Sequence, residues 1–240
     1  MSQFKEKAIV LINPNRFCLN YKNIPYRTEW LELEDIELHL KKLGIKPTGK
    51  KPDGRDLYTL PAIHDPSTGT YLADSFLIAQ YLDKTYPDTP PILPSDSIGL
   101  QVAFEEQFMS ALVPLWQFIT VHSIGLLTPR GQEYGRRSKE MQFGKRLEDM
   151  EPKGEDAERE WEVLRNALGK IDGYYAKVEG SGPFILGPSI SWGDIVVVSA
   201  MIWIRLSFGE ESQRWKYISS WHGGRWGALL KAFNAFFTIV

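Results

Sequence analysis

Two short segments, separated by a predicted hairpin, carry residue types that suit the binding of a short acidic peptide. Residues 59–63 predict a strand with Pro61 near its start, a position where a sheet edge tolerates proline. A cis bond between Leu60 and Pro61 would turn the backbone so that the N–H and C=O of Leu60 face outward. An extended peptide could then pair with Leu60 as an added strand.

The second segment is a helix start at Asp74 and Ser75, followed by an apolar helical stretch to residue 82. The free N–H groups and the positive dipole end of a helix favour a carboxylate. We define the clamp as Leu60, Pro61, Asp74 and Ser75, and we predict that it holds a short peptide with an acidic group at one end. The alternative interpretation is a plain turn at Leu60-Pro61 and a plain helix cap at Asp74.

The elements around the clamp predict a thioredoxin-like α/β domain over residues 1–87, with the order β-α-β-α-β-β-α. The expected elements are a strand at 8–12, a helix from Asn13-Pro14-Asn15 to about residue 23, a strand at 26–33, a helix at 35–43 before Gly44, a hairpin of 60–64 and 70–72, and a helix at 74–85. Asn13 with Pro14 is a good signal for a helix start.

A second, all-helical domain is predicted over residues 96–240. The proline-rich segment 86–96 indicates a stiff linker in front of it. Helices are expected over 100–124 and 155–178, where apolar residues recur at three- and four-residue steps. Ser191 and Asp194 have the spacing of a capping box, which we take as evidence of fold and not of catalysis. The charged segment 126–155 is interpreted as a solvated extension of a helical hairpin.

Composition restricts the possible partners. The chain has 240 residues, 43% of them hydrophobic, and a net charge of −2, which argues against nucleic acid or an anionic membrane as the main partner. Its single cysteine, Cys18, excludes an internal disulfide, and no apolar run approaches the ~20 residues of a membrane span, so we expect a cytoplasmic protein. The four histidines show no metal-ligand spacing, and no metal is expected.

The clamp, together with other motifs, resembles the glutathione site of the cytosolic glutathione transferases. The further motifs are Leu19-Asn20-Tyr21-Lys22-Asn23-Ile24-Pro25-Tyr26, Lys51-Pro52-Asp53-Gly54-Arg55-Asp56, Ala73-Asp74-Ser75 and Tyr81-Leu82-Asp83-Lys84-Thr85-Tyr86-Pro87. They are similar to the fungal FuA class, which is related to bacterial lignin β-etherases. The resemblance implies a thioredoxin-like domain, an all-α second domain, glutathione as co-substrate and a homodimer.

The same resemblance implies a role for each clamp residue. The backbone of Leu60, before a cis Pro61, would pair with the cysteinyl part of glutathione. Ser75 would hydrogen-bond the γ-glutamyl carboxylate, and Asp74 would attract the ammonium group. The glycyl carboxylate would be reached by a basic residue: Arg16, with Lys46 and Arg55 as open alternatives.

Glutathione transfer needs a thiolate near neutral pH, so the enzyme must stabilise that anion. In the FuA class a longer loop precedes a Ser-Pro-Asn segment, whereas this chain passes directly from residues 11–12 to Asn13. Asn13 corresponds to that serine, and its carboxamide N–H can donate to sulfur, with Asn15 as the alternative. Asn13 is equally suited to be a helix cap. Cys18 is expected to face inward as a small hydrophobe and not as a nucleophile.

The acceptor pocket is expected between the domains, lined by Met109, Leu112 and Trp116 on one helix face, although such a stripe also suits a packed core. The sequence thus predicts a glutathione transferase for small hydrophobic aromatic substrates, with detoxification as its role. The alternative is a non-catalytic, ligandin-like or regulatory protein that binds glutathione or another ligand and has lost the catalytic loop.

Overall fold

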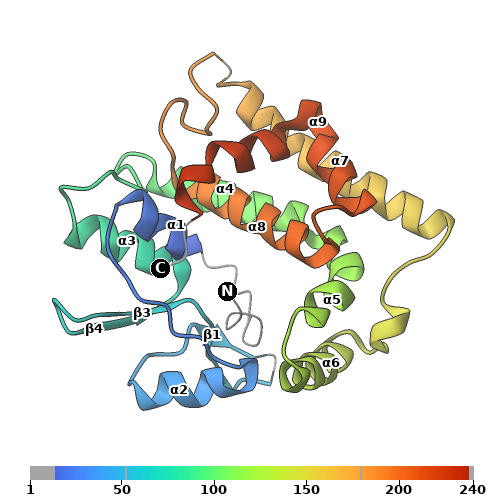
Figure 1. Ribbon diagram of the computed structural model, residues 1–240, viewed down its shortest axis with the longest axis horizontal. Helices are drawn as coiled ribbons and strands as arrows, with labels where there is room; N and C mark the ends of the chain where they lie inside the picture. Colours follow the sequence, from blue (N-terminus) through green and yellow to red (C-terminus); the bar gives the residue numbers. More distant parts are fainter. Residues whose placement is uncertain (1–13, 52, 179, 238–240) are drawn as a thin grey trace, which may run out of the picture.

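The computed structural model describes residues 14–51, 53–178 and 180–237. Figure 1 shows an α/β part, which holds the strands and α1 to α3, beside a larger part built from α4 to α9. The α/β part contains α1 (Pro14–Tyr21), η1 (Leu33–Asp35), α2 (Ile36–Lys42), β1 (Gly49–Lys50), β2 (Asp56–Leu57), β3 (Ala62–Asp65), β4 (Thr70–Ala73) and α3 (Ser75–Thr85). The helical part contains α4 (Ile98–Ala111), η2 (Val113–Leu115), α5 (Trp116–Gly125), α6 (Pro129–Phe143), η3 (Leu147–Asp149), α7 (Glu155–Ala176), α8 (Trp192–Phe208), α9 (Gln213–Ala232) and η4 (Asn234–Phe236).

The β3–β4 hairpin forms where the sequence predicts it. Ala62 pairs with Ala73 and Asp65 with Thr70 in an antiparallel register. Gly69 closes the turn with a φ of 71° and donates its N–H to Asp65 O at 2.9 Å, a conformation that glycine adopts without steric cost. The register places the residue before β3 next to the residue after β4, which are both clamp positions.

Asp65 fixes this hairpin onto α3. Its Oδ2 accepts hydrogen bonds from the hydroxyls of Tyr81, at 2.6 Å, and Tyr86, at 2.7 Å. Ser67 donates both its N–H and its hydroxyl to Oδ1. Burial raises the pKa of Asp65, but these hydrogen bonds outweigh that effect and hold the pKa well below its usual range.

The strand predicted over residues 26–33 is wrong for the described residues. Residues 24–32 carry no strand, and Leu33 begins the 3-10 turn η1. A strand exists through ladder hydrogen bonds to a neighbour, and none of the described strands pairs with this segment. The strand predicted over residues 8–12 lies outside the described residues.

A buried ion pair connects α1, α3 and the proline-rich linker. The side chain of Lys22, directly after α1, has no solvent exposure, and its Nζ lies 2.6 Å from Asp83 Oδ1 and 3.1 Å from Pro90 O. The N–H groups of Ile92 and Leu93 donate to Asp83 Oδ2 at 2.9 and 2.7 Å. An ammonium removed from water needs such partners, so this pair fixes the course of the linker.

The predicted helix over residues 100–124 is wrong in one respect, because it is interrupted. The structure has α4, the 3-10 turn η2 with Pro114, and α5 in its place, since proline has no N–H to donate to the preceding turn. By length and hydropathy, residues 98–125 would pass as a membrane span. The interruption at η2 and the burial of Phe108 and Ile119 in the core assign this stretch to the helical bundle.

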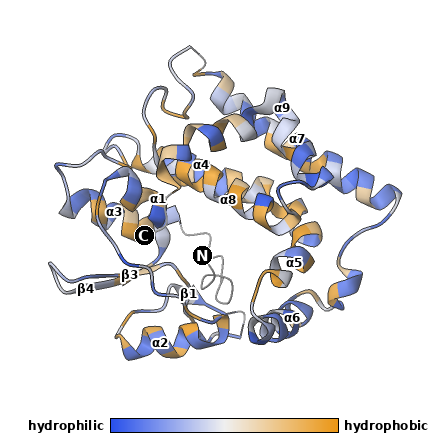
Figure 2. Cartoon of the chain, in the orientation of Figure 1, coloured by the Kyte–Doolittle hydropathy of each residue, from blue (hydrophilic) through white to orange (hydrophobic). Residues whose placement is uncertain are grey.

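Helix α8 is the buried centre of the helical part, and it is largely hydrophobic in Figure 2, whereas α6 is mostly hydrophilic. The predicted capping box is present at its start: Ser191 donates its N–H, at 3.0 Å, and its hydroxyl, at 2.8 Å, to Asp194 Oδ2. Oδ1 of Asp194 accepts from Tyr175 Oη at 3.1 Å and from Ile185 N–H at 2.9 Å. Burial nevertheless raises the pKa of Asp194 to about 6.

We expect Asp83→Ala to lower the free energy of unfolding by about 3–5 kcal/mol, because it leaves the buried Lys22 ammonium without a counter-charge. Urea denaturation followed by circular dichroism measures the change. The matched control is Asp56→Ala, which breaks the exposed pair with Lys50 and should change stability little. Equal losses in the two variants would contradict a special role for the buried pair.

We expect the stability deficit of Asp194→Asn, relative to the wild type, to shrink as the pH rises from about 4 to about 7. The folded chain binds the Asp194 proton more tightly than the unfolded chain, so its contribution to stability is complete below about pH 4 and is lost through about pH 6. The difference amounts to roughly 3 kcal/mol, since each unit of pKa shift is worth about 1.36 kcal/mol. Urea denaturation across this pH range measures it. A deficit that grows with pH would show that the four donors stabilise the carboxylate more than burial destabilises it.

Candidate functional site

The hairpin brings the two halves of the clamp together. Ala62 and Ala73 pair at the open end of the β3–β4 ladder, and the N–H of Asp74 donates to Pro61 O at 3.3 Å just beyond them. The peptide bond before Pro61 is cis, which is the condition on which the expected clamp depends. Ser75 then begins α3, so the clamp residues lie at one end of the hairpin.

Leu60 is held by its side chain while its backbone remains available. The side chain packs against a small core cluster that includes Leu40 and Ile45. Neither the N–H nor the C=O of Leu60 hydrogen-bonds with any residue of the described ranges. An extended ligand can pair with such a backbone segment in the manner of an added strand.

Asp74 combines a helix cap with an unusual backbone conformation. Its φ of 88° and ψ of 121° fall in a region that residues other than glycine rarely adopt. Its Oδ1 accepts the N–H groups of Phe76, at 2.9 Å, and Leu77, at 3.0 Å. The cap and the N–H bond to Pro61 together hold this conformation in place and fix the start of α3.

Ser75 presents donors at the start of α3, and α1 supports it from behind. Neither the N–H nor the hydroxyl of Ser75 bonds to another residue within the part of the chain that the structure describes. Its C=O accepts a hydrogen bond from Nδ2 of Asn15, at 2.8 Å, and Asn15 is completely buried. This hydrogen bond of Asn15 therefore connects α1 to the start of α3.

The three basic residues considered for the glycyl carboxylate differ in their surroundings. The Arg16 guanidinium lies 6.0 Å from the Phe17 ring, and its Nε has no hydrogen-bond partner among the described residues. Lys46 is exposed, and Arg55 forms an exposed ion pair with Asp53 at 2.6 Å. The ion pair engages Arg55 in a turn, which leaves Arg16 and Lys46 for this role.

Arg16, Leu60 and Pro61 line one cavity of about 560 Å³ together with residues 24–31. Residues 8–12, predicted as a strand of the same domain, lie outside the described residues. Arg16 thus borders the same cavity as Leu60 and Pro61, the first half of the clamp.

The catalytic position suggested by the sequence, Asn13, lies outside the described residues. Helix α1 begins at the next residue, Pro14, and has eight residues. Cys18 is fully buried in the core, as expected, and burial raises the pKa of its thiol far above its usual range. A thiol in this state is not a nucleophile, so Cys18 is a packing residue.

The three residues predicted to share one helix face are divided by the break at η2. Met109 lies on α4 and is 43% exposed, whereas Leu112 caps α4 and is only 3% exposed, because it packs in the core. Trp116 begins α5 and lines a cavity. Leu112 is therefore a core residue in this structure, and its place in an acceptor pocket stays a prediction.

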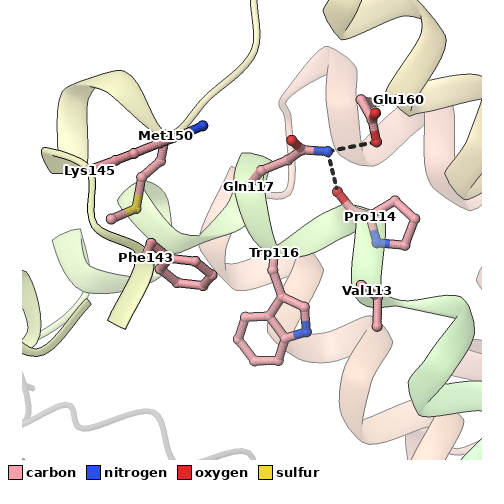
Figure 3. Close-up of a pocket in the computed structure, with 8 residues that line it drawn as sticks. All are labelled: Val113, Pro114, Trp116, Gln117, Phe143, Lys145, Met150 and Glu160. Atoms are coloured by element: carbon pink, nitrogen blue, oxygen red, sulfur yellow. Dashed lines mark hydrogen bonds between the residues drawn. The ribbon is translucent and has the colours of Figure 1, made fainter. Parts of the chain in front are cut away.

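Trp116 belongs to a cavity of about 400 Å³ that we call the aromatic cavity (Figure 3). It is lined by Val113, Pro114, Trp116, Gln117, Phe143, Lys145, Met150 and Glu160. Gln117 Nε2 donates to Glu160 Oε2 at 2.8 Å and to Pro114 O at 3.2 Å, which closes one side. The segment 126–155, interpreted from its charge as a solvated extension, supplies Phe143, Lys145 and Met150, so that interpretation is incomplete. The aromatic and apolar residues among the charged ones of this segment were the signal in the sequence that part of it is packed.

No group of three or more His, Cys, Asp or Glu side chains within residues 14–51, 53–178 and 180–237 is arranged to hold a metal ion. The site does offer backbone groups, hydroxyls, carboxylates and aromatic rings. These groups suit the binding of a polar peptide and an aromatic molecule.

Comparison with known families assigns both parts of the chain. The family model described as the N-terminal domain of glutathione S-transferase matches residues 14–85, and the C-terminal domain model of the same family matches residues 99–236. A curated relative, the glutathione S-transferase-like protein ustS of Aspergillus flavus, is 31% identical over 230 residues, which cover 90% of this chain and 80% of the relative.

Comparison with solved structures leads to the same family. Glutathione transferase GSTFuA3 from Phanerochaete chrysosporium is 37% identical, with a TM-score of 0.91 over 100% of this chain and 95% of that chain. CsGST63524 of Ceriporiopsis subvermispora, solved in complex with glutathione, is 37% identical, with a TM-score of 0.87 over 95% of this chain and 90% of that chain. These similarities confirm the predicted fold class and the resemblance to the FuA class.

We expect Asp74→Ala to be less stable than Asp74→Gly, although alanine usually stabilises helices. Both variants lose the cap, but only alanine carries a Cβ at a φ of 88°. Asp74→Ala should lose about 1–3 kcal/mol in the free energy of unfolding, and Asp74→Gly about 1 kcal/mol or less. Urea denaturation measures both, with Asp74→Asn, which keeps the cap, as control. Alanine matching glycine would mean that the backbone at Asp74 relaxes freely.

Proposed function

Since this chain belongs to the glutathione S-transferase family, we propose that it binds glutathione at the clamp and transfers it to hydrophobic aromatic electrophiles. One observation carries the proposal. The bond from Asp74 N–H to Pro61 O joins Leu60, whose backbone bonds to no described residue, to the donors of Ser75. The backbone of Leu60 suits an extended peptide, and the donors of Ser75 suit a carboxylate. Glutathione has both a peptide backbone and a carboxylate. Glutathione is also the ligand in the related structure from Ceriporiopsis subvermispora.

Each clamp residue has a distinct part in this proposal. The N–H and C=O of Leu60 pair with the cysteinyl backbone. The N–H and hydroxyl of Ser75 donate to the γ-glutamyl carboxylate, which the positive end of α3 also attracts. Asp74 uses Oδ1 for the cap, and its negative charge attracts the ammonium of the same γ-glutamyl group. Arg16 is the proposed partner of the glycyl carboxylate.

The chemistry requires the glutathione sulfur as an anion. The thiol proton leaves to solvent, the thiolate attacks an electrophilic carbon, a C–S bond forms, and the leaving group departs with its electron pair. The protein contributes proximity and anion stabilisation. We propose Asn13, the residue before Pro14 in the sequence, as the hydrogen-bond donor to sulfur. We do not carry Asn15 in this role, because its buried amide donates to Ser75 O.

The acceptor molecule is proposed to lie between the two parts of the protein, near Met109 and Trp116. Met109 is 43% exposed on α4, and Trp116 faces the aromatic cavity. An aromatic electrophile fits such surroundings because flat rings pack well against indole and thioether groups. We also propose that the protein is a homodimer with a cytoplasmic location, as the sequence leads us to expect.

We expect Ser75→Ala to weaken glutathione binding by about 10- to 150-fold, because a hydrogen bond to a charged group is worth roughly 1.5–3 kcal/mol. The stability of the fold should change little, since the cap comes from Asp74. Isothermal titration calorimetry measures the affinity. Ser95→Ala, at an exposed position of the linker, is the matched control and should bind like the wild type.

The same samples separate the enzyme from the non-catalytic alternative. Conjugation of a chloronitroaromatic compound to glutathione by the wild type supports a transferase. Glutathione binding without turnover of several electrophile classes would identify a binding protein that keeps the clamp. Unchanged glutathione affinity in Ser75→Ala would show that the clamp is not the glutathione site.

A further inference from the structure

Helix α9 contains a break in its middle, which we call the hinge. Trp221 has a ψ of 153°. His222, Gly223 and Gly224 follow with φ values of 53°, 69° and 81°. A right-handed helix has negative φ throughout, so α9 consists of two helical halves joined by these four residues. Glycine adopts a positive φ without steric cost, whereas histidine adopts it rarely, so the contacts of His222 hold the hinge in this conformation.

His222 connects the second half of α9 to α7, and Figure 1 shows the two helices beside each other. Its Nδ1 accepts a hydrogen bond from Trp226 Nε1 at 3.1 Å, and Trp226 is completely buried. An indole nitrogen only donates, so Nδ1 carries no proton and the neutral ring has its proton on Nε2. The ring also hydrogen-bonds the backbone of Arg165, on α7. Gly169 leaves room for this approach, because a Cβ there would lie 3.2 Å from Nε2.

The residues that follow the hinge, 225–237, pack against α1, and we call them the C-terminal segment. The rings of Phe233 and Phe237 meet the ring of Phe17 edge to face, at centroid distances of 5.9 and 5.6 Å. Asn20 Nδ2 donates to Phe236 O at 2.6 Å. Helix α1 is thus supported by a segment whose own position depends on the hinge.

A proton on Nδ1 of His222 is incompatible with the bond to Trp226. Both nitrogens would then be donors, and the buried indole N–H would lose its acceptor, which is costly away from water. Burial is the main effect on the ring and holds the pKa of His222 below its usual value. Among the charged groups that act on it, Asp172 raises this pKa, whereas Arg165 and Arg225 lower it.

We propose that His222 and Trp226 form a pH-sensitive latch: protonation of Nδ1 breaks their hydrogen bond and loosens the C-terminal segment from α7 and α1. The docked segment binds this proton more weakly than the loosened one, so docking is complete well above about pH 6.5 and weakens as the pH falls below it. Gly223 and Gly224 give the hinge the backbone freedom for the movement.

The movement is limited, because a second contact holds the segment. Arg225, its first residue, forms an ion pair with Asp172 on α7, and this pair does not involve the histidine proton. The segment therefore loosens without unfolding the rest of the helical part. The latch needs no glutathione, and its failure in the test below leaves the proposed glutathione site untouched.

Amide hydrogen exchange of the full chain, followed by mass spectrometry at about pH 7.5 and about pH 5.5, tests the proposal. The protection factor, which corrects for the effect of pH on the chemistry of exchange, reports how often each segment opens. For residues 225–237 we expect it to fall by about threefold to tenfold at the lower pH, because each pH unit shifts a one-proton equilibrium by at most about tenfold. Peptides of α4 are the internal reference and should keep their protection.

Two histidine variants assign the effect. His222→Gln removes the titrating group and keeps an acceptor for Trp226, so the segment should have the same protection at both pH values. His122→Gln is the matched control, since His122 contacts Arg214 in the first half of α9. It should respond to pH like the wild type.

Trp226→Phe tests the latch from its other side, without changing the histidine. It keeps an aromatic ring and removes the indole donor, so the segment should open more often at both pH values and depend less on pH. The proposal is overturned if the wild-type segment keeps its protection at about pH 5.5, if His222→Gln loses protection as the wild type does, or if all parts of the chain lose protection equally. Circular dichroism at both pH values confirms that each variant is folded.

Discussion

The buried ammonium of Lys22 is the constraint on which the arrangement of this protein depends. An ammonium without solvent exposure needs a counter-charge, and Asp83 at the end of α3 supplies it. The same carboxylate accepts the N–H of Ile92, and the C=O of Ile92 accepts the N–H of Trp192 at 2.9 Å. One continuous set of polar contacts therefore runs from α1 through α3 and the linker to the capped start of α8, which is the centre of the helical part.

Helix α3 is held at both ends, and this is why the clamp is well defined. Lys22 fixes its C-terminal end, whereas Asn15 and Pro61 fix its first residues through hydrogen bonds to Ser75 O and from Asp74 N–H. Asp74 keeps its unusual φ because these contacts prevent its backbone from relaxing to a more favourable conformation. A ligand that binds here meets preorganised donors, which lowers the entropic cost of binding.

Local signals in the sequence predicted the clamp, the hairpin and the capping box of α8, because each depends on residues close together in the chain. Contacts between residues that are far apart in the sequence were not predictable in this way. Lys22 gives no local sign that it is buried, and a strand at 26–33 depends on a neighbour. The break at Pro114 had a signal, but the apolar spacing on both sides of it favoured one continuous helix. Phe143 meets Trp116 only because the α5–α6 connection folds back.

Helix α6 joins the aromatic cavity to the α/β part. It carries Phe143, and at its start Thr128 donates to Glu32 Oε2 at 2.7 Å while Arg130 pairs with Asp35 at 3.0 Å. These contacts hold α6 against η1, directly before α2. A ligand in the cavity can influence the α/β part through α6 only if it binds two positions of α6 with different affinity. Helix α6 therefore connects the aromatic cavity to η1, and a shift of α6 is a route from the cavity to the α/β part.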